Sequence, residues 1–332
     1  MIETKGIEER KKVMPDTIQI GGEKINRGED KHLYLRIAKL PTHTNIDLPV
    51  RVIRGKESGP VLLLTGGLHG DEINGIEIVR RMLARNMLTP DKGTIIAIPL
   101  MNIYGFIQNV RGVPDGKDIN RSFPGSKTGS LAKLVAYTIM NEIIPKINYG
   151  IDFHTGGASR ANFPQIRCVL NIEKNIELAR AFAPPVILHS PLIDNSFRKA
   201  AYKKKKHILV YETGESLRYD EFGIKIAIEG TLRVMNYLGM KSTIFDSAGS
   251  TDIFQSSVWA RAPLAGLFTS KIKNGDEVKK KQVLGVITDP FGSDVDTIKS
   301  RYDGRVIGVN YNPIVHKGDA IMHIAINKQN NE

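Results

Sequence analysis

The sequence predicts an α/β fold, in which a mixed, mostly parallel sheet carries helices on both faces, followed by a small all-β domain. Apolar runs such as 60–65 and 94–99 are typical of strands buried on both faces. They alternate with segments of helical spacing. After about residue 246 the chain changes to short β-type runs separated by Gly, Asp and Pro. We therefore expect an N-terminal lead-in and strand at 1–45, an α/β domain at 46–245 and an all-β domain at 246–332.

The expected elements follow in chain order. Residues 1–30 are polar and suggest a loosely attached lead-in, and alternating polarity predicts half-buried strands at 33–40 and 49–54. Buried strands are expected at 60–65 and 94–99, with a helix at 71–87 between them. The long Gly-, Pro- and Asn-rich stretch at 102–129 is typical of a functional loop. Beyond it we expect helices at 131–144, 173–183, 197–205 and 221–238, and strands at 151–154, 168–170, 186–188 and 208–211.

The C-terminal region contains an imperfect internal repeat. Gly266 leads to Val-Lys-Lys-Lys-Gln-Val-Leu-Gly at 278–285, and Gly304, 38 residues later, leads to Val-His-Lys-Gly-Asp-Ala-Ile-Met at 315–322. Each half is interpreted as a β-hairpin unit, and the pattern resembles the biotinyl/lipoyl-type sandwich. A carrier domain of that type needs a Lys at the exposed tip between its halves, but the tip at 289–294 has none. We therefore expect a scaffold domain that carries no lipoyl group.

Composition excludes several classes of protein. Apolar residues make up 41% and charged residues 25%, so extensive disorder is not expected. The single cysteine, Cys168, excludes an internal disulfide and a zinc site built from cysteines. The N-terminus lacks the apolar core of a signal peptide, and no apolar run approaches the roughly 20 residues of a membrane span. These features predict a soluble, cytoplasmic protein that has no membrane partner.

The chain has a formal net charge of +12, and the excess is unevenly distributed. Residues 246–332 hold 11 Lys or Arg and 10 Asp or Glu, so nearly all of the surplus lies before them. The densest run is four lysines at 203–206, without aromatic interleaving or a nucleic-acid motif around it. We interpret this run as a solvated helix end or loop and expect no nucleic-acid partner.

The segment Gly66-Gly-Leu-His69-Gly-Asp-Glu72 carries the strongest chemical signal. His69 and Glu72 are three residues apart where a buried strand meets a helix, so that their side chains can lie on one face and hold one cation. Open zinc sites commonly use two histidines and one carboxylate. Helix capping is the simpler explanation of this pair taken alone.

His154 is the candidate third ligand. It ends the buried strand at 151–154, and side chains at the carboxyl ends of such strands face the crevice where α/β proteins bind ligands. Asp152 lies on the same strand face and could hold the His154 ring through its second nitrogen. Asp71 is a weaker alternative for that role.

Four ordered motifs together resemble the succinylglutamate desuccinylase/aspartoacylase family, which has a zinc-carboxypeptidase-like fold. The resemblance extends over about residues 49–240, and the β-rich tail suits the family as well. Its marks in this sequence are Gly-Gly-Leu-His69-Gly-Asp-Glu72, Asp118-Ile-Asn120-Arg121-Ser-Phe-Pro-Gly125, Asp152-Phe-His154-Thr, and Glu212 in Val210-Tyr-Glu-Thr-Gly214.

The resemblance implies roles for individual residues. His69, Glu72 and His154 would hold one zinc ion per chain. Glu212, at the end of a buried strand, would act as the general base, and Glu215 is the competing candidate.

In the long loop, Arg111 matches the family's oxyanion-stabilising arginine. Asn120 and Arg121 match the pair that grips a substrate carboxylate. Arg160, Asn162 and Arg167 could read the far end of the substrate or could serve structural roles.

The residues and the resemblance together predict a zinc-dependent amidohydrolase. It would remove an N-acyl group from an amino acid or a similar small, carboxylate-bearing amine, so that its partner is a small anionic substrate. The alternatives are a metallocarboxypeptidase that trims a C-terminal residue, acidic ones included, from a peptide, and a non-catalytic binding relative. Trp259 is expected in the core of the tail, and the six histidines outside the motifs are assigned no role. The acyl group, the amine and the oligomeric state stay open.

Overall fold

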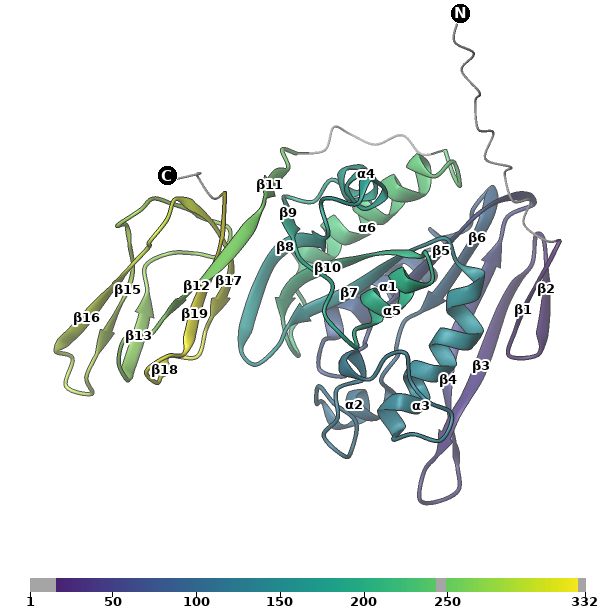
Figure 1. Ribbon diagram of the computed structural model, residues 1–332, viewed down its shortest axis with the longest axis horizontal. Coiled ribbons are helices and arrows are strands. Elements are labelled where there is room, and N and C mark those ends of the chain that lie inside the picture. Colours follow the sequence, from purple (N-terminus) through teal and green to yellow (C-terminus); the bar gives the residue numbers. More distant parts are fainter. Residues whose placement is uncertain (1–15, 243–248, 328–332) are drawn as a thin grey trace, which may run out of the picture.

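The computed structural model describes residues 16–242 and 249–327, and one 13-stranded mixed sheet runs through most of them (Figure 1). Its strands are β3 (Asp30–Lys39), β4 (Asn45–Arg54), β5 (Glu57–Thr65), β6 (Lys92–Ile98), β7 (Tyr149–Gly156), β8 (Arg160–Cys168), β9 (Val186–His189), β10 (His207–Glu215), β11 (Asp252–Phe254), β12 (Ser256–Arg261), β14 (Glu277–Val278), β17 (Gly304–Asn310) and β19 (Ala320–Ile326).

The main strand order is β12-β19-β17-β8-β10-β7-β5-β6-β4-β3. The central strands β10, β7, β5 and β6 are parallel to one another, whereas the strands on both sides of them pair antiparallel. The predicted mixed α/β sheet is thus confirmed, with its parallel part at the centre. The carboxyl ends of β5, β7 and β10 meet at one edge of this parallel part, where a ligand crevice is expected.

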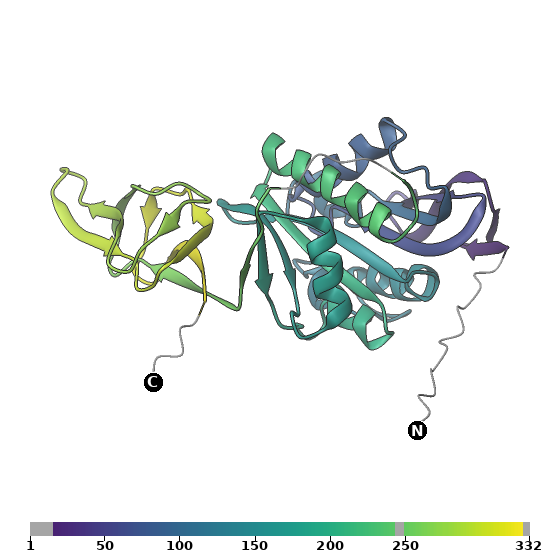
Figure 2. The same cartoon turned by 90° about the horizontal axis from the view of Figure 1, so that it is seen from above.

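Helices cover both faces of the sheet (Figures 1 and 2). Leu62 and Leu64 of β5 belong to one buried cluster, with α1 (Ile73–Ala84), α4 (Glu173–Phe182) and α6 (Glu221–Tyr237). Leu63 points the other way, into a second cluster with α3 (Leu131–Thr138) and α5 (Phe197–Lys203). This alternation follows from the strand period of two residues, and it explains why the apolar run at 60–65 has no polar gaps.

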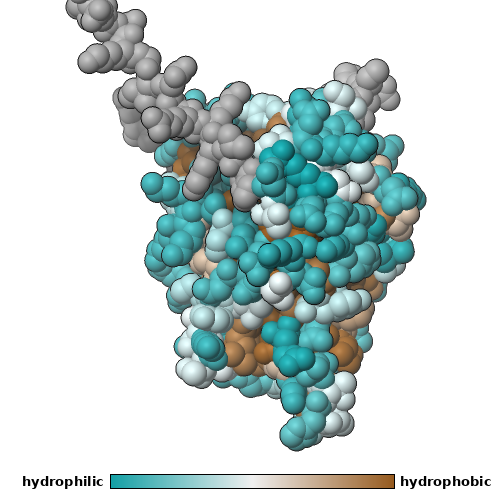
Figure 3. Space-filling view, turned by 90° about the vertical axis from the view of Figure 1, so that its right-hand side faces the viewer, coloured by the Kyte–Doolittle hydropathy of each residue, from teal (hydrophilic) through white to brown (hydrophobic). Residues whose placement is uncertain are grey.

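The N-terminal part is better anchored than its polar sequence suggested. Strands β1 (Thr17–Ile20) and β2 (Glu23–Asn26) form a hairpin whose Ile18, Ile20 and Ile25 are buried in the cluster below α3. The expectation of a loose lead-in is therefore wrong for these residues, while residues 1–15 lie outside the described part. This end of the molecule presents a mainly hydrophilic surface, on which apolar residues form separate patches (Figure 3).

The C-terminal strands form a two-layer sandwich that extends from one end of the α/β part (Figures 1 and 2). One layer is the end of the large sheet, and the other is a four-stranded sheet of β16 (Asp294–Lys299), β15 (Val283–Thr288), β13 (Gly266–Ser270) and β18 (Ile314–Val315).

The internal repeat appears in the register of this sandwich. Gly266 pairs with Val315, and Gly304 pairs with Val278. The glycine that opens each half therefore lies opposite the short strand of the other half, and the two halves are interlocked.

The structure corrects one local expectation and adds detail to two others. The strand expected at 168–170 is β8, which ends at Cys168 and carries Arg160, Asn162 and Pro164. The helix expected at 131–144 is α3, followed by a π-helical turn at Ile139–Ile143 and a 3-10 turn at Ile144–Lys146. The loop at 102–129 contains the short helix α2 (Ile103–Gln108) and a 3-10 turn at Ile119–Arg121.

The division into regions at 1–45, 46–245 and 246–332 stays a prediction, and its second boundary falls outside the described residues. None of the helices at 16–242 and 249–327 is both long and apolar enough to cross a membrane.

Candidate active site

The site begins where β5 ends and α1 starts. Gly67 has a positive φ of 58°, and a Cβ atom on Gly66 would lie 2.6 Å from the backbone of Gly75 in α1. The two glycines therefore let the chain turn sharply and bring the first turn of α1 against the strand end. His69 lies in the segment that joins β5 to α1, Glu72 is the N-cap residue of α1, and both side chains are buried.

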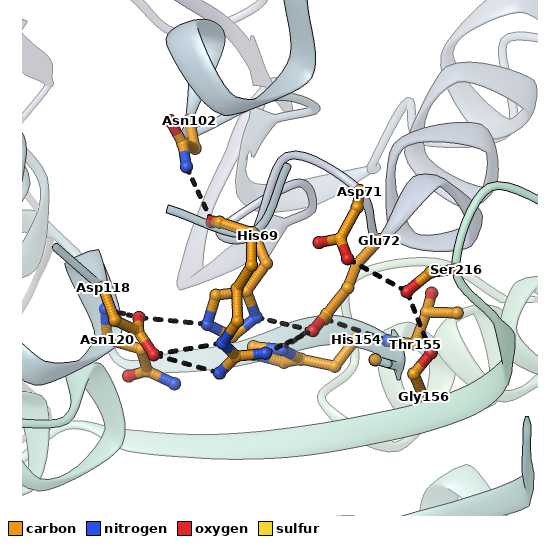
Figure 4. A network of polar contacts seen from close by, with 12 residues as sticks. His69, Asp71, Glu72, Asn102, Asp118, Asn120, His154, Thr155, Gly156 and Ser216 are labelled. Carbon is orange, nitrogen blue, oxygen red and sulfur yellow. Dashed lines mark hydrogen bonds and ion pairs between the residues drawn. The ribbon is translucent and has the colours of Figure 1, made fainter. Parts of the chain in front are cut away.

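His154 of β7 lies beside them. Its Nδ1 is 2.9 Å from Glu72 Oε2, while His69 Nδ1 is 2.7 Å from Glu72 Oε1 (Figure 4). One ligand atom from each of the three residues falls within 4.8 Å of the others. His69 Nδ1 is buried and has no hydrogen-bond partner among the described residues, despite this close approach. These donors fit a single metal ion, because two imidazoles and a carboxylate face the same small volume.

The outer nitrogens of both histidines are held by carboxylates. Asp152 Oδ2 lies 2.7 Å from Nε2 of His154, and Asp118 Oδ1 lies 3.2 Å from Nε2 of His69. Such outer carboxylates fix the ring orientation of a metal-binding histidine. Asp152 is in the position expected for it, whereas the weaker alternative, Asp71, instead accepts a hydrogen bond from Ser216 at 3.2 Å.

Opposite charges within this group stabilise one another. Burial alone would raise the pKa of Glu72, but His69 and His154 hold it well below its usual range. Burial would likewise lower the pKa of His154, but Asp152 and Glu72 raise it well above its usual range. Glu72 is therefore an ionised carboxylate, the form in which it can bind a cation.

Asp118 links three functional positions. Besides contacting His69, it accepts hydrogen bonds from Arg111 Nε at 3.2 Å and from the backbone N–H of Asn120 at 2.7 Å (Figure 4). Arg111 also donates to Glu72 Oε1 at 3.0 Å. The sequence motif contained Asp118, but nothing in the sequence pattern assigned it a role.

Asp118→Asn is expected to weaken metal affinity by about 10- to 100-fold, the usual effect of losing an outer-shell partner. The amide can still accept a hydrogen bond from His69, but it removes the negative charge that orients His69 and Arg111. Zinc affinity can be measured by competition with a chromophoric chelator. Asp115→Asn is the matched control, because Asp115 is exposed in the same loop and contacts Lys117. Equal zinc affinities of the two variants would contradict this role for Asp118.

One cavity of about 260 Å3 brings the sequence-predicted residues together. Those that line it are His69, Glu72, Arg111, Asn120, Arg121, His154, Arg160, Asn162 and Glu212, together with Arg167. Within this cavity Asn120 accepts a hydrogen bond from the backbone N–H of Phe197 at 2.9 Å, and Arg121 lies exposed beside it.

Glu212 lies directly beside His154, because β10 and β7 are paired with these two residues in register. Its Oε2 accepts a hydrogen bond from Asn162 Nδ2 at 2.8 Å, and Arg167 Nη1 lies 3.5 Å from Oε1. Glu215, the competing candidate for the base, is not among the residues that line the cavity. The geometry therefore favours Glu212.

The places of two further residues in the cavity were not predicted from the sequence. Arg198 of α5 is buried and donates to the backbone oxygens of Arg167, Ser190 and Pro191, and its burial lowers the pKa of Arg198 to about 10. Trp259 of β12 lines the cavity, so its expected place in the core of the tail was wrong.

Comparison with known proteins agrees with the family resemblance. The succinylglutamate desuccinylase/aspartoacylase catalytic domain matches residues 58–238. A curated relative, N-alpha-acetyl-L-2,4-diaminobutyric acid deacetylase from Halomonas elongata, is 29% identical over 301 residues, covering 84% of this chain and 85% of its own.

Two solved structures are similar over nearly their whole length. The succinylglutamate desuccinylase/aspartoacylase from Rhodobacter sphaeroides has a TM-score of 0.80 and 25% identity, over 92% of this chain and 97% of that one. The product-bound ectoine utilization protein EutE (DoeB) from Ruegeria pomeroyi has a TM-score of 0.77 and 22% identity, over 90% and 94%. At that identity the second structure supports the fold alone.

Proposed function

The chain belongs to the succinylglutamate desuccinylase/aspartoacylase family, and from this we propose that it is a zinc-dependent amidohydrolase. It would remove an N-acyl group from an amino acid or a similar small amine that bears a carboxylate. The observation that carries the proposal is one cavity in which His69, Glu72 and His154 face one another with Glu212 beside them.

His69, Glu72 and His154 would hold the metal. Their donor set of two imidazoles and one carboxylate fits zinc and leaves room for further ligands. Zinc in such a site lowers the pKa of water and polarises a carbonyl.

The other cavity residues supply proton transfer and binding. Glu212 takes a proton from the attacking water and delivers it to the leaving nitrogen, a task for a carboxylate on the cavity wall. Arg111 stabilises the negative charge that develops on the scissile carbonyl oxygen. Asn120 and Arg121 hold the substrate carboxylate, since a guanidinium can form a bidentate pair with it.

Two observations favour a small acylated amine over a polypeptide. The Halomonas elongata relative is named as a deacetylase of an acetylated amino acid. In addition, Trp259 brings the C-terminal strands into the wall of the cavity, which limits the room for a peptide chain. Five arginines line the cavity, which supports an anionic substrate: Arg111, Arg121, Arg160, Arg167 and Arg198.

A substrate screen tests the proposal. Protein purified without a histidine tag is assayed with N-acetyl-, N-succinyl- and N-formyl-amino acids beside short acidic peptides, with and without a chelator. We expect about one zinc per chain by metal analysis and chelator-sensitive hydrolysis of at least one acylated amino acid. Turnover of the peptides alone would favour the carboxypeptidase alternative. No turnover by zinc-loaded protein would favour a binding relative.

Arg121→Ala is expected to raise KM for carboxylate-bearing substrates by about 10- to 100-fold, because a hydrogen bond to a charged group contributes about 1.5–3 kcal/mol. KM for the matching neutral amides should change by less than about threefold, and kcat should change little, because the contact is made equally before and during the reaction. The measurement is steady-state kinetics on acid and amide pairs. Arg36→Ala, at an exposed position of β3, serves as the control. Equal effects on acids and amides would refute the carboxylate contact.

A further inference from the structure

We propose that Trp259 is a positioning residue of the cavity, whose indole ring helps to hold the Arg160 guanidinium in place. The inference deepens the proposed function and rests on it for its kinetic test only. Trp259 belongs to the C-terminal strands, where the sequence suggested nothing but core packing.

The strand order places Trp259 far from the candidate metal ligands. In the sequence β12-β19-β17-β8-β10-β7, Trp259 is on the first strand and His154 is on the last. Neighbouring strands are about 4.8 Å apart, so five steps separate the two backbones by roughly 24 Å. Both side chains nevertheless line the same cavity.

Arg160 is held by the Trp259 ring and by one backbone oxygen. Its Cζ atom lies 5.9 Å from the centre of the Trp259 ring, within the range of a cation–π contact. Its Nε donates to the Gly157 carbonyl oxygen at 2.9 Å. Within 16–242 and 249–327, no carboxylate forms an ion pair with Arg160. The guanidinium is thus fixed in place without being neutralised, and its charge stays available to an anionic group of a ligand.

The Trp259 ring stacks on a second ring. Trp259 pairs across the strands with His323, and the two rings stack at 4.4 Å with an interplanar angle of 4°. Nε2 of His323 lies 2.8 Å from the Ser257 hydroxyl oxygen. Burial, together with the charges of Arg167 and Arg160, lowers the pKa of His323 to about 3. A neutral imidazole therefore supports the ring and adds no second cation beneath Arg160.

A row of neighbouring residues connects this stack to the general base. Across four strands the register partners are Trp259, His323, Gly308 and Asn162, and Asn162 donates to Glu212. Gly308 has no side chain, and a Cβ atom there would lie 3.1 Å from the side-chain oxygen of Asn162. The row lies on the cavity side of the sheet, since Trp259, Asn162 and Glu212 all line the cavity.

Fluorescence provides a direct test, because Trp259 is the only tryptophan in the chain. Arg160→Ala should change the emission of the unliganded protein, whereas Arg36→Ala should not. In the zinc-loaded Glu212→Gln protein, N-alpha-acetyl-L-2,4-diaminobutyric acid and N-succinyl-L-glutamate are titrated, and at least one should change the emission saturably. Unchanged emission in Arg160→Ala and in both titrations would overturn the proposal.

Kinetics provide the second test. Trp259→Ala should raise KM by about 3- to 30-fold with kcat changed by less than about threefold, as expected for a lost cation–π contact of moderate strength. Trp259→Phe, which keeps an aromatic face, should recover part of the loss. Because Trp259 is proposed to act through Arg160, the KM of the double variant Trp259→Ala/Arg160→Ala should be no higher than the KM of Arg160→Ala alone.

The outcomes separate the two proposals. Independent, multiplicative effects of the two substitutions, or an unchanged KM in a folded Trp259→Ala protein, would overturn the role of Trp259. If no acylated amino acid is hydrolysed by the wild type, the proposed function fails. In that case the emission change in Arg160→Ala still decides whether Trp259 holds Arg160.

Discussion

Replacing Glu212 with Gln is expected to lower kcat by about 10²- to 10⁴-fold, the range for losing a general base, while zinc stays bound. The amide has the same shape and can remain beside Asn162, whose Nδ2 lies 2.8 Å from the carboxylate in the wild type. It cannot take a proton from water at neutral pH. The measurement is kcat on the best substrate of the screen, together with zinc content.

Glu215→Gln is the matched control, since Glu215 is on the same strand but outside the cavity lining. Its kcat should stay within about threefold of the wild type. If Glu212→Gln retains near wild-type turnover while Glu215→Gln does not, the base is Glu215 and our assignment is wrong.

Removal of zinc is expected to abolish turnover and to lower the melting temperature. A ligand that binds only the folded state stabilises it, so removing zinc from His69, Glu72 and His154 should lower the melting temperature. His154→Ala should show both effects without a chelator. The measurements are zinc content, turnover and thermal unfolding.

His32→Ala is the control for that experiment, because His32 is exposed on β3, away from the cavity. It should retain zinc, turnover and melting temperature. A chelated protein that keeps full activity, with zinc shown to be absent, would refute the metal-dependent reaction.

Much of the fold was predictable because its signals are local. The apolar run at 60–65 and the alternation at 49–54 depend on the burial of single strands, and both segments are strands in the structure. Strand β8 was missed because its cavity side carries Arg160 and Asn162 and its middle contains Pro164. A strand that faces a polar cavity lacks the apolar pattern by which buried strands are recognised.

The candidate site was predictable where motifs carry it. His69 and Glu72 are close in sequence, and His154 and Glu212 lie near the carboxyl ends of β7 and β10, strands that the pattern revealed. Asp118, Arg198 and Trp259 could not be placed in this way, because their roles arise from contacts between distant segments. A cytoplasmic location and the absence of a nucleic-acid partner stay predictions.

The basic residues of the chain include two separate groups, one in the cavity and one outside it. Five arginines line the cavity, for which we propose an anionic substrate. The lysines at 203–206 lie at the end of α5 and just after it, where Lys203, Lys204 and Lys205 are exposed. Nothing in the structure gives that run a role in the site.

The pairing of β17 with β8 has a consequence for biosynthesis. At Ala161 and Asn162 the outer neighbour of β8 is β17, and Gln165 of β8 donates to the Ile307 carbonyl oxygen at 2.9 Å. During translation, β8 therefore emerges with this part of its edge uncovered until residues 304–310 have left the ribosome. Exposed strand edges favour aggregation, so the nascent chain passes through a vulnerable interval. A ribosome stalled before residue 304 would carry a chain that contains the candidate metal ligands and Trp259 but lacks β17, the strand that pairs with this edge of β8.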